Sequence, residues 1–458
     1  MSNIVETINP FTEKKLKEYT LMSHQEAKNA VENANVCFHT WKLVPVAERA
    51  KLANALAKVI ENNQGELVEL MVEEMVKVQG KQEVQLCAAI CRFVAEQAES
   101  ELADEERSYE NGHAIITYQP IGVILGIQPW NFPLYQVIRY SITNVVAGNT
   151  TVMKHASNVF GMAEKIEVMF TEAGFPNYCY QSLLIDGETA NKLISHEKIR
   201  GITFTGSDKV GKLVGEAAGK LAKKTVLELG SNDAYIVLDD ADIPLAVEAC
   251  VKSRVINNGE TCVSAKRFIV TEKNYEQFKD AFLQGMSNLK MGDPNKVDTD
   301  LGPMARKDLR DELHEQVSQS IIAGATFLCG CKIPEMTGYF YPASVLGDVK
   351  EHTPAYDDEL FGPVASLIKV KDDNEAIVVA NDSRYGLGGG IFSTNVECAT
   401  EIAIKHFDTG MVNINGYSLA QPNLPFGGVK NSRYGREHGG FGLKEFVNIK
   451  TVMITDFA

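Results

Sequence analysis

Short apolar runs that alternate with helical segments are the feature that restricts the possible folds most strongly. Runs of this length and composition are typical of strands in a parallel sheet that is buried on both faces. Their alternation with helices indicates βαβ units. A first set covers residues 114–118, 122–127, 151–153, 182–185, 201–204, 225–229 and 234–238, and a second covers 267–270, 364–370, 389–392 and 411–415. The sequence therefore predicts two α/β domains that meet near residue 230.

The two ends of the chain differ from this pattern. Residues 24–100 have apolar side chains at helical spacing, which predicts mainly helix. Residues 446–454 alternate enough to form a strand after a glycine-rich loop. A terminal strand of this kind either pairs across subunits or is an ordinary edge strand of its own domain. The pattern alone leaves both alternatives open.

Composition argues against several classes of protein. The 458 residues carry 45 Lys and Arg against 60 Asp and Glu, and the net charge of −15 disfavours nucleic acids and acidic membranes as partners. No apolar run approaches the length of about 18 residues that a transmembrane helix needs. Charges near the N-terminus leave no room for the apolar stretch of a signal peptide. Nine cysteines, an odd number, fit reduced thiols. We therefore predict a cytoplasmic protein, and the spacing of Cys and His predicts no metal site.

Two segments carry groups suited to covalent catalysis. Cys262 ends the segment NNGETC, which follows a helical stretch through a turn that contains glycine. A thiol is nucleophilic when it is exposed and lies in positive potential, and a helix end at a cleft supplies both. Glu228 ends a predicted strand at the sheet edge where α/β sites form, and burial would raise its pKa enough for a base. Alternatively, Cys262 is a buried structural thiol, and Glu228 is a capping or solvated residue.

Three further segments, PWNFP, FTGSDKVG and VMKHAS, follow predicted strands or cross from strand to helix. The Asn131 amide is a neutral donor that stabilises an oxyanion, or else it forms an Asx turn. Gly206 and Gly211 let the backbone approach a ligand closely, and the helix that begins there favours a phosphate. A plain turn is the alternative. Lys154 offers a point charge for phosphate, and Ser157 offers a hydroxyl donor.

The order of these motifs resembles the aldehyde dehydrogenase superfamily over essentially the whole chain. The shared motifs are PWNFP, FTGS, ELGS, GETC, DELFGP, LPFGGVKNS and YGRE. The resemblance implies a Rossmann-like parallel-sheet cofactor domain, an α/β catalytic domain and a small oligomerisation strand element, in a homodimer or homotetramer. The implied boundaries are 1–100 and 119–229 for the dinucleotide-binding domain, 230–430 for the catalytic domain, and 101–118 and 440–458 for the bridging element.

The resemblance also implies a mechanism. In such enzymes the thiol at the Cys262 position attacks an aldehyde, and the Asn131 amide holds the resulting oxyanion together with the Cys262 N–H. Hydride passes to the nicotinamide, and water activated by Glu228 releases the carboxylic acid. Phe426 matches an aromatic position of the substrate tunnel. The cofactor positions implied in the same way are Trp130, Gly206, Ser207, Gly211, Leu229, Glu359 and Phe361.

This sequence departs from the family at two positions near the implied site. Ser231 stands where the family usually has a second Gly after Glu-Leu, and Glu260 stands where it usually has Gln. A carboxylate that faced Cys262 would raise the pKa of the thiol. We therefore expect the Glu260 side chain to point away from the sulfur.

The cofactor and the aldehyde are predicted from three residues. Many NAD-using relatives carry Glu at the Ser157 position, where it would repel a 2′-phosphate, whereas Lys154 pairs with one. This predicts NADP, with NAD possible. Arg139 occupies a position where succinate-semialdehyde dehydrogenases carry Arg, whose planar fork suits a carboxylate. The alternative for Arg139 is a surface residue paired with a Glu.

The predicted substrate is therefore succinate semialdehyde, although three matches to such enzymes are missing. Residues 418–421 give no clear match to the tunnel Ser that some of them carry. Ile256 stands where some of them carry a second Arg, and Ser264 stands where some carry a second Cys. The alternatives are a broad aliphatic aldehyde dehydrogenase and a CoA-acylating enzyme.

Overall fold

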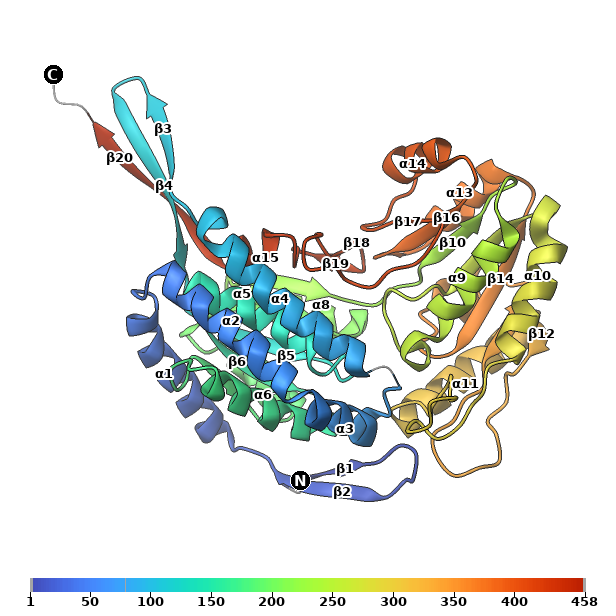
Figure 1. Ribbon diagram of the computed structural model, residues 1–458, viewed down its shortest axis with the longest axis horizontal. Helices are drawn as coiled ribbons and strands as arrows, with labels where there is room; N and C mark the ends of the chain where they lie inside the picture. The colour runs from blue at the N-terminus through green and yellow to red at the C-terminus, as the bar shows by residue number, and fades with distance from the viewer. Residues whose placement is uncertain (1–2, 79, 456–458) are drawn as a thin grey trace.

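The structure, a computed structural model, describes residues 3–78 and 80–455, so the outermost residues of the predicted terminal segments lie outside it. Two large, mainly parallel sheets lie in its two halves, and a three-stranded arm projects from one of them (Figure 1). The chain leaves the first large sheet at Glu228 and enters the second at Ala234. The predicted α/β fold class is confirmed.

The first large sheet is parallel except for one short edge strand. Its order is β19 (Arg433–Tyr434), β9 (Lys224–Glu228), β8 (Ile199–Thr205), β5 (Val123–Gln128), β6 (Thr150–His155) and β7 (Tyr180–Ser182), with β19 antiparallel to β9. One apolar core contains α1 (His24–Trp41), α7 (Gly187–Ile194) and α8 (Asp208–Gly219). Another contains α2 (Val46–Asn62), α3 (Gln64–Met75), α4 (Gly80–Glu101), α5 (Tyr135–Ala147) and α6 (Phe160–Glu172).

The second large sheet is also buried on both faces. Its order is β12 (Thr326–Cys329), β13 (Ser344–Gly347), β14 (Val364–Val370), β11 (Arg267–Thr271), β10 (Ala234–Val237), β16 (Gly389–Phe392) and β17 (Asn413–Ile414). In β10, Ile236 packs with α11 (Lys307–Ile322), α13 (Asp373–Asn381) and α14 (Val396–Lys405). Its neighbour Tyr235 packs with α9 (Ile243–Val255) and α10 (Glu272–Ser287) on the other face. Successive side chains alternate between the faces, which explains why the strands read as continuous apolar runs.

The arm consists of β3 (Glu105–Tyr109), β4 (Gly112–Pro120) and β20 (Val447–Thr455), in the order β20-β4-β3. The prediction of a parallel strand at 114–118 is wrong, because β4 pairs antiparallel with both neighbours and is only partly buried. Strand β20 pairs with β4 of its own chain over all 9 of its residues. Within the described residues its other edge has no partner.

The remaining elements are small. They are β1 (Ile4–Ile8) paired with β2 (Lys15–Thr20), β15 (Tyr385–Gly386) paired with β18 (Val429–Lys430), α12 (Pro354–Asp357), α15 (Phe441–Glu445), and the 3-10 turns η1 (Ser157–Val159) and η2 (Ile256–Gly259). Two predicted strands are shorter or displaced, since β7 ends at Ser182 and only Asn413–Ile414 pair within 411–415. Among the described helices, none combines the length and apolarity needed to cross a membrane.

Candidate active site

A cavity of about 600 Å³ brings together several of the predicted site residues. It is lined by Trp130, Asn131, Gly206, Ser207, Leu229, Cys262, Glu359 and Phe361, among others. Of the other predicted residues, all of which the structure describes, the lining does not include Lys154, Ser157, Gly211, Glu228, Arg139 and Phe426. The predicted thiol and the predicted oxyanion donor therefore face one space, although they are far apart in the sequence.

The nucleophile loop, residues 257–266, turns sharply after α9. Asn257, Asn258 and Gly259 have φ values of 52°, 56° and 77° in succession. Asn and Gly adopt this left-handed region more readily than other residues do. A Cβ at Gly259 would lie 2.3 Å from the carbonyl carbon of Gly362, so only glycine fits there. This turn places Cys262 at the cavity.

A buried arginine holds the nucleophile loop through its backbone. Arg254, in the last turn of α9, donates from Nη2 to the Gly259 carbonyl at 2.7 Å and to Ser264 Oγ at 3.0 Å. Its Nη1 donates to the Ala265 carbonyl at 2.8 Å. These bonds close the loop on the helix that precedes it.

Asn131 is fixed against the same loop. Its Nδ2 donates to the Glu260 carbonyl at 3.1 Å. Its own carbonyl accepts from Asn257 Nδ2 at 2.9 Å and from Lys77 Nζ at 3.1 Å. Lys77 in turn forms a fully buried ion pair with Glu83, at 2.9 Å. The asparagine is therefore positioned by the loop that carries the thiol and by Lys77, which Glu83 of α4 holds in place.

Burial and four charged groups set the pKa of Cys262. Burial is the largest influence and raises the pKa of the thiol to about 11. Lys266 and Arg139 lower the pKa, whereas Glu359 and Asp233 raise it. The thiol is mainly protonated at neutral pH, so a nearby cation directly affects how much thiolate exists.

Glu228 lies at the end of β9 with only 2% of its surface exposed. Its carbonyl accepts from the Gly206 N–H at 3.0 Å, which joins the ends of β8 and β9. The two residues that follow it, Leu229 and Gly230, line the cavity. A Cβ at Gly230 would lie 2.8 Å from Glu359 Oε2, so glycine permits the close approach of that carboxylate.

The two departures from the family pattern have structural partners. As predicted, Glu260 turns away from the thiol, and its carboxylate accepts from the Ala305 N–H at 3.1 Å. Burial raises the pKa of Glu260 well above its ordinary value, which favours the neutral form. Ser231 Oγ donates to the buried carboxylate of Asp233. Neither residue brings an additional charged carboxylate to the sulfur.

The turn between β8 and α8 lines the cavity at a helix N-terminus. Ser207 caps α8, and its Oγ accepts from the Val210 N–H at 3.5 Å. Gly206 and Ser207 line the cavity at this helix N-terminus, as a phosphate site requires. Gly211 has a different use, because its Cβ would lie 2.1 Å from Leu229 Cδ2. It allows α8 to pack on the sheet.

Lys154 and Ser157 lie at the carboxyl end of β6. Burial lowers the pKa of Lys154, Asp186 raises it, and Arg306 lowers it. Within the described residues, the Lys154 ammonium has no carboxylate at ion-pair distance. Ser157 begins the short turn η1 and is exposed. A phosphate that reached Lys154 would therefore find no carboxylate of the described residues at ion-pair distance, and Asp186 would act on the ammonium only from farther away.

Arg139 is placed differently from the prediction that it is free for a substrate. It is 1% exposed, and its Nε lies 3.0 Å from Glu437 Oε2. Its Nη2 donates to Thr205 Oγ1 at 2.7 Å. The guanidinium carbon lies 5.2 Å from the ring centre of Tyr135 and 5.5 Å from that of Phe426. Arg139 is therefore paired with a Glu, as in the alternative prediction, but the pair is buried and not on the surface.

Sequence reasoning missed other residues of the cavity and its surroundings. The lining also includes Lys209, Arg306, Gln316, Arg384 and Tyr385. Of the missed residues, only the basic pair Lys266–Arg267 could have been noticed in the sequence. Two charges directly before an apolar strand must find buried partners. Within the described residues, no group of three or more Cys, His, Asp and Glu side chains could hold a metal ion.

Comparison with known proteins agrees with this arrangement. The model of the aldehyde dehydrogenase family matches residues 1–452. A protein of Synechocystis sp. named probable succinate-semialdehyde dehydrogenase (NADP+) is 41% identical over 98% of this chain and 99% of its own length. The succinate-semialdehyde dehydrogenase (NADP+) of Mycobacterium leprae is 40% identical over 98% and 99%.

A solved structure has the same fold. The succinic semialdehyde dehydrogenase of Streptococcus pyogenes, in complex with NADP+, superposes with a TM-score of 0.96 at 35% identity. The match covers 98% of this chain and 100% of that chain.

Proposed function

This chain belongs to the aldehyde dehydrogenase family, and we propose that it oxidises succinate semialdehyde to succinate with NADP as the acceptor. One observation carries the proposal: Cys262 and Asn131 line the same cavity as Glu359 and the N-terminus of α8. The cavity therefore combines a nucleophile and an oxyanion donor with groups suited to a dinucleotide.

The residues of the cavity fit a nicotinamide dinucleotide. The α8 N-terminus supplies N–H donors for a pyrophosphate, and Trp130 and Phe361 form an aromatic pair with ring centres 6.0 Å apart. Within the described residues, Glu359 Oε1 is buried and accepts no hydrogen bond, so it is available to ribose hydroxyls. When bound, NADP accepts the hydride of the aldehyde.

The chain itself supplies the covalent and acid–base steps. Cys262 Sγ attacks the carbonyl carbon of the aldehyde, and its proton leaves to solvent or to a base. The Asn131 amide and the Cys262 N–H stabilise the oxyanion that forms. After oxidation to the thioester, Glu228 takes a proton from the water that releases the acid. Glu228 directly precedes the cavity residues Leu229 and Gly230 in the chain.

Replacement of Cys262 tests the nucleophile. We expect Cys262→Ala to lower kcat by a factor of at least about 10³, because no other group can form the thioester. Cys250→Ala is the matched control, since Cys250 is a fully buried thiol in α9, in the core on one face of the second sheet. It should keep kcat within about twofold. Turnover by the Cys262 variant at the rate of the control would contradict the mechanism.

The cofactor preference rests on Lys154 and Ser157. The Lys154 ammonium, which has no carboxylate of the described residues at ion-pair distance, would meet the 2′-phosphate of NADP, and Ser157 carries no charge to repel it. The relatives named as NADP-dependent enzymes support this choice. We expect a higher kcat/KM with NADP than with NAD, and equal or better efficiency with NAD would contradict it.

The substrate assignment rests on Arg139 and on the names of the relatives. A substrate carboxylate must share the guanidinium with Glu437 or displace that residue. The existing pair favours the alternative of a broad aliphatic aldehyde dehydrogenase, because a guanidinium that is already neutralised attracts anions weakly.

Succinate semialdehyde and butanal distinguish the two candidates. We expect Arg139→Ala to raise KM for succinate semialdehyde by about tenfold or more, and to raise KM for butanal much less. Equal losses for both aldehydes would remove the carboxylate assignment and leave the broad-specificity enzyme.

The proposal includes a cytoplasmic homodimer or homotetramer. Strand β20 has an edge without a partner in the described chain and carries exposed apolar side chains, Ile449, Val452, Met453 and Ile454. An edge of this kind is stabilised when another strand or subunit covers it. Light scattering on the purified protein tests the assembly, and a monomer at micromolar concentration would contradict it.

A further inference from the structure

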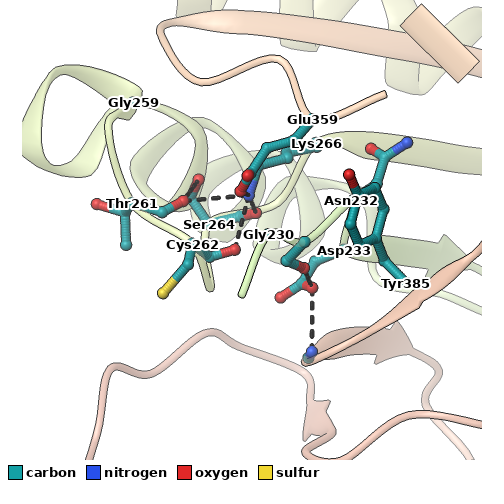
Figure 2. A network of polar contacts seen from close by, with 12 residues as sticks. Gly230, Asn232, Asp233, Gly259, Thr261, Cys262, Ser264, Lys266, Glu359 and Tyr385 are labelled. Atoms are coloured by element: carbon teal, nitrogen blue, oxygen red, sulfur yellow. Dashed lines mark hydrogen bonds and ion pairs between the residues drawn. The ribbon is translucent and has the colours of Figure 1, made fainter. Parts of the chain in front are cut away.

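Lys266 contacts the nucleophile loop at three points. Its Nζ donates to the carbonyls of Cys262 at 2.7 Å, Thr261 at 3.1 Å and Ser264 at 3.3 Å. The side chain is 1% exposed. Figure 2 shows the ammonium enclosed by the loop backbone, with the Cys262 side chain pointing away from it.

The number of hydrogen bonds that Lys266 donates indicates its protonation state. A lysine ammonium has three N–H donors, whereas a neutral amine has two. Three carbonyl acceptors therefore favour the protonated form, against the burial that lowers the pKa of Lys266. The charge remains inside the protein, close to the thiol whose carbonyl it binds.

Lys266 also reaches the cofactor side of the cavity. Its Nζ lies 3.5 Å from Glu359 Oε1, and the two side chains run side by side in Figure 2. All three of its protons are already used by the loop, which explains why Glu359 Oε1 accepts no hydrogen bond within the described residues. Lys266 attracts this carboxylate without occupying the oxygen.

We propose that the Lys266 ammonium, held in place by the carbonyls of the Cys262 loop, acts as a positioning residue that favours the reactive thiolate of Cys262 electrostatically and is opposed by Glu359. The ammonium favours the thiolate of Cys262, and the Glu359 carboxylate opposes it. This inference rests on the proposed function only in taking Cys262 as the nucleophile.

Other charged groups also act on the Cys262 thiol and the Lys266 ammonium. Arg139 from α5 favours the thiolate, and Asp233 opposes it. Arg254 from α9 lies near the Lys266 ammonium, as do Asp233 and Glu359. Among the groups that lower the pKa of the thiol, Lys266 has the largest effect and Arg139 the next. Lys266 is therefore the residue whose removal should change the thiol most.

The test is the pH dependence of Cys262 alkylation by iodoacetamide, without aldehyde or dinucleotide. Cys398 is exposed, so Cys398→Ser is the background, and peptide mass spectrometry measures modification at Cys262. We expect Lys266→Met to slow alkylation at pH 8 by about three- to tenfold and to move the midpoint upward. Lys266→Arg, which keeps the charge, should recover part of the rate.

The sign of the change separates the electrostatic effect of the ammonium from a general loss of structure. A loosened loop would expose the thiol, return its pKa toward the ordinary value and speed alkylation. Unchanged or faster alkylation of Lys266→Met would overturn the proposal.

Glu359→Gln gives the opposite test and keeps all three loop bonds. It should speed alkylation at pH 8 by about two- to fivefold, because it removes an opposing charge. An unchanged or slower rate would overturn the opposition by Glu359, even if Lys266→Met failed to fold. Since neither measurement uses an aldehyde, a wrong substrate assignment would leave both results unaffected.

Discussion

Buried cations lie near Cys262 in two regions of the molecule, and the two regions stabilise their cations in different ways. In α5, Arg139 faces a carboxylate, and its Nε lies 3.0 Å from Glu437. In the nucleophile loop, Arg254 and Lys266 donate mainly to backbone carbonyls. The first cation is neutralised by a carboxylate at close range, whereas the second pair is solvated mainly by carbonyl dipoles, with Glu359 3.5 Å from the Lys266 ammonium.

This difference separates two functions of buried charge. A carbonyl dipole stabilises a cation without cancelling its field, so Lys266 still acts on the thiol. A close ion pair has a weaker field at a distance, so Arg139 becomes a strong anion binder only when its carboxylate partner is exchanged. The loop cation therefore affects the reactivity of the Cys262 thiol, whereas the Arg139–Glu437 pair can respond to the carboxylate of a substrate.

Breaking the α5 pair should have the largest effect on stability. Arg139→Met leaves Glu437 buried without its cation, and we expect the free energy of unfolding to fall by about 3–5 kcal/mol. Urea denaturation measures the change. The double variant Arg139→Met with Glu437→Gln should recover most of the loss, because it removes both charges. Failure of the second substitution to recover stability would show that the pair is not held by charge.

Removing Arg254 should have a smaller effect that no single partner can compensate. Arg254→Met leaves the carbonyls of Gly259 and Ala265 and the Ser264 hydroxyl without a donor, which should cost about 2–3 kcal/mol of unfolding free energy. The same denaturation experiment measures it. A loss below about 0.5 kcal/mol would mean that the loop holds its conformation without this cation.

The pH dependence of thiol alkylation should change least in the α5 double variant. Loss of a cation disfavours the thiolate and raises the thiol pKa, so the midpoint moves to higher pH. Because this variant removes a positive and a negative charge together, we expect a shift below about half a pH unit. Lys266→Met should shift the midpoint further. Equal shifts would remove the distinction between the two regions.

Much of the fold could be predicted from the sequence because its parallel strands are short and buried on both faces. The runs at 122–127 and 364–370 became β5 and β14. The run at 114–118 misled, since an apolar strand in a projecting antiparallel arm has similar composition. Strands β17 and β7 were displaced because backbone pairing sets strand ends, and composition does not.

Only part of the candidate site could be predicted from the sequence. Asn131, Cys262 and Glu359 lie in recognisable motifs, and all three line one cavity. Lys266 and Arg254 were not found, because their partners are carbonyls, which every residue has. Gly211 was assigned to ligand approach, but its missing Cβ leaves room for Leu229.

The sequence alone determined that this chain forms an α/β enzyme of the aldehyde dehydrogenase family, because ordered motifs and apolar periodicity are properties of the chain itself. Only the tertiary structure decided which charged groups act electrostatically on the Cys262 thiol. That depends on the distance and orientation of partners from separate elements, such as Glu437 for Arg139 and the loop carbonyls for Lys266. Electrostatic effects depend on separation and burial, which a sequence does not specify.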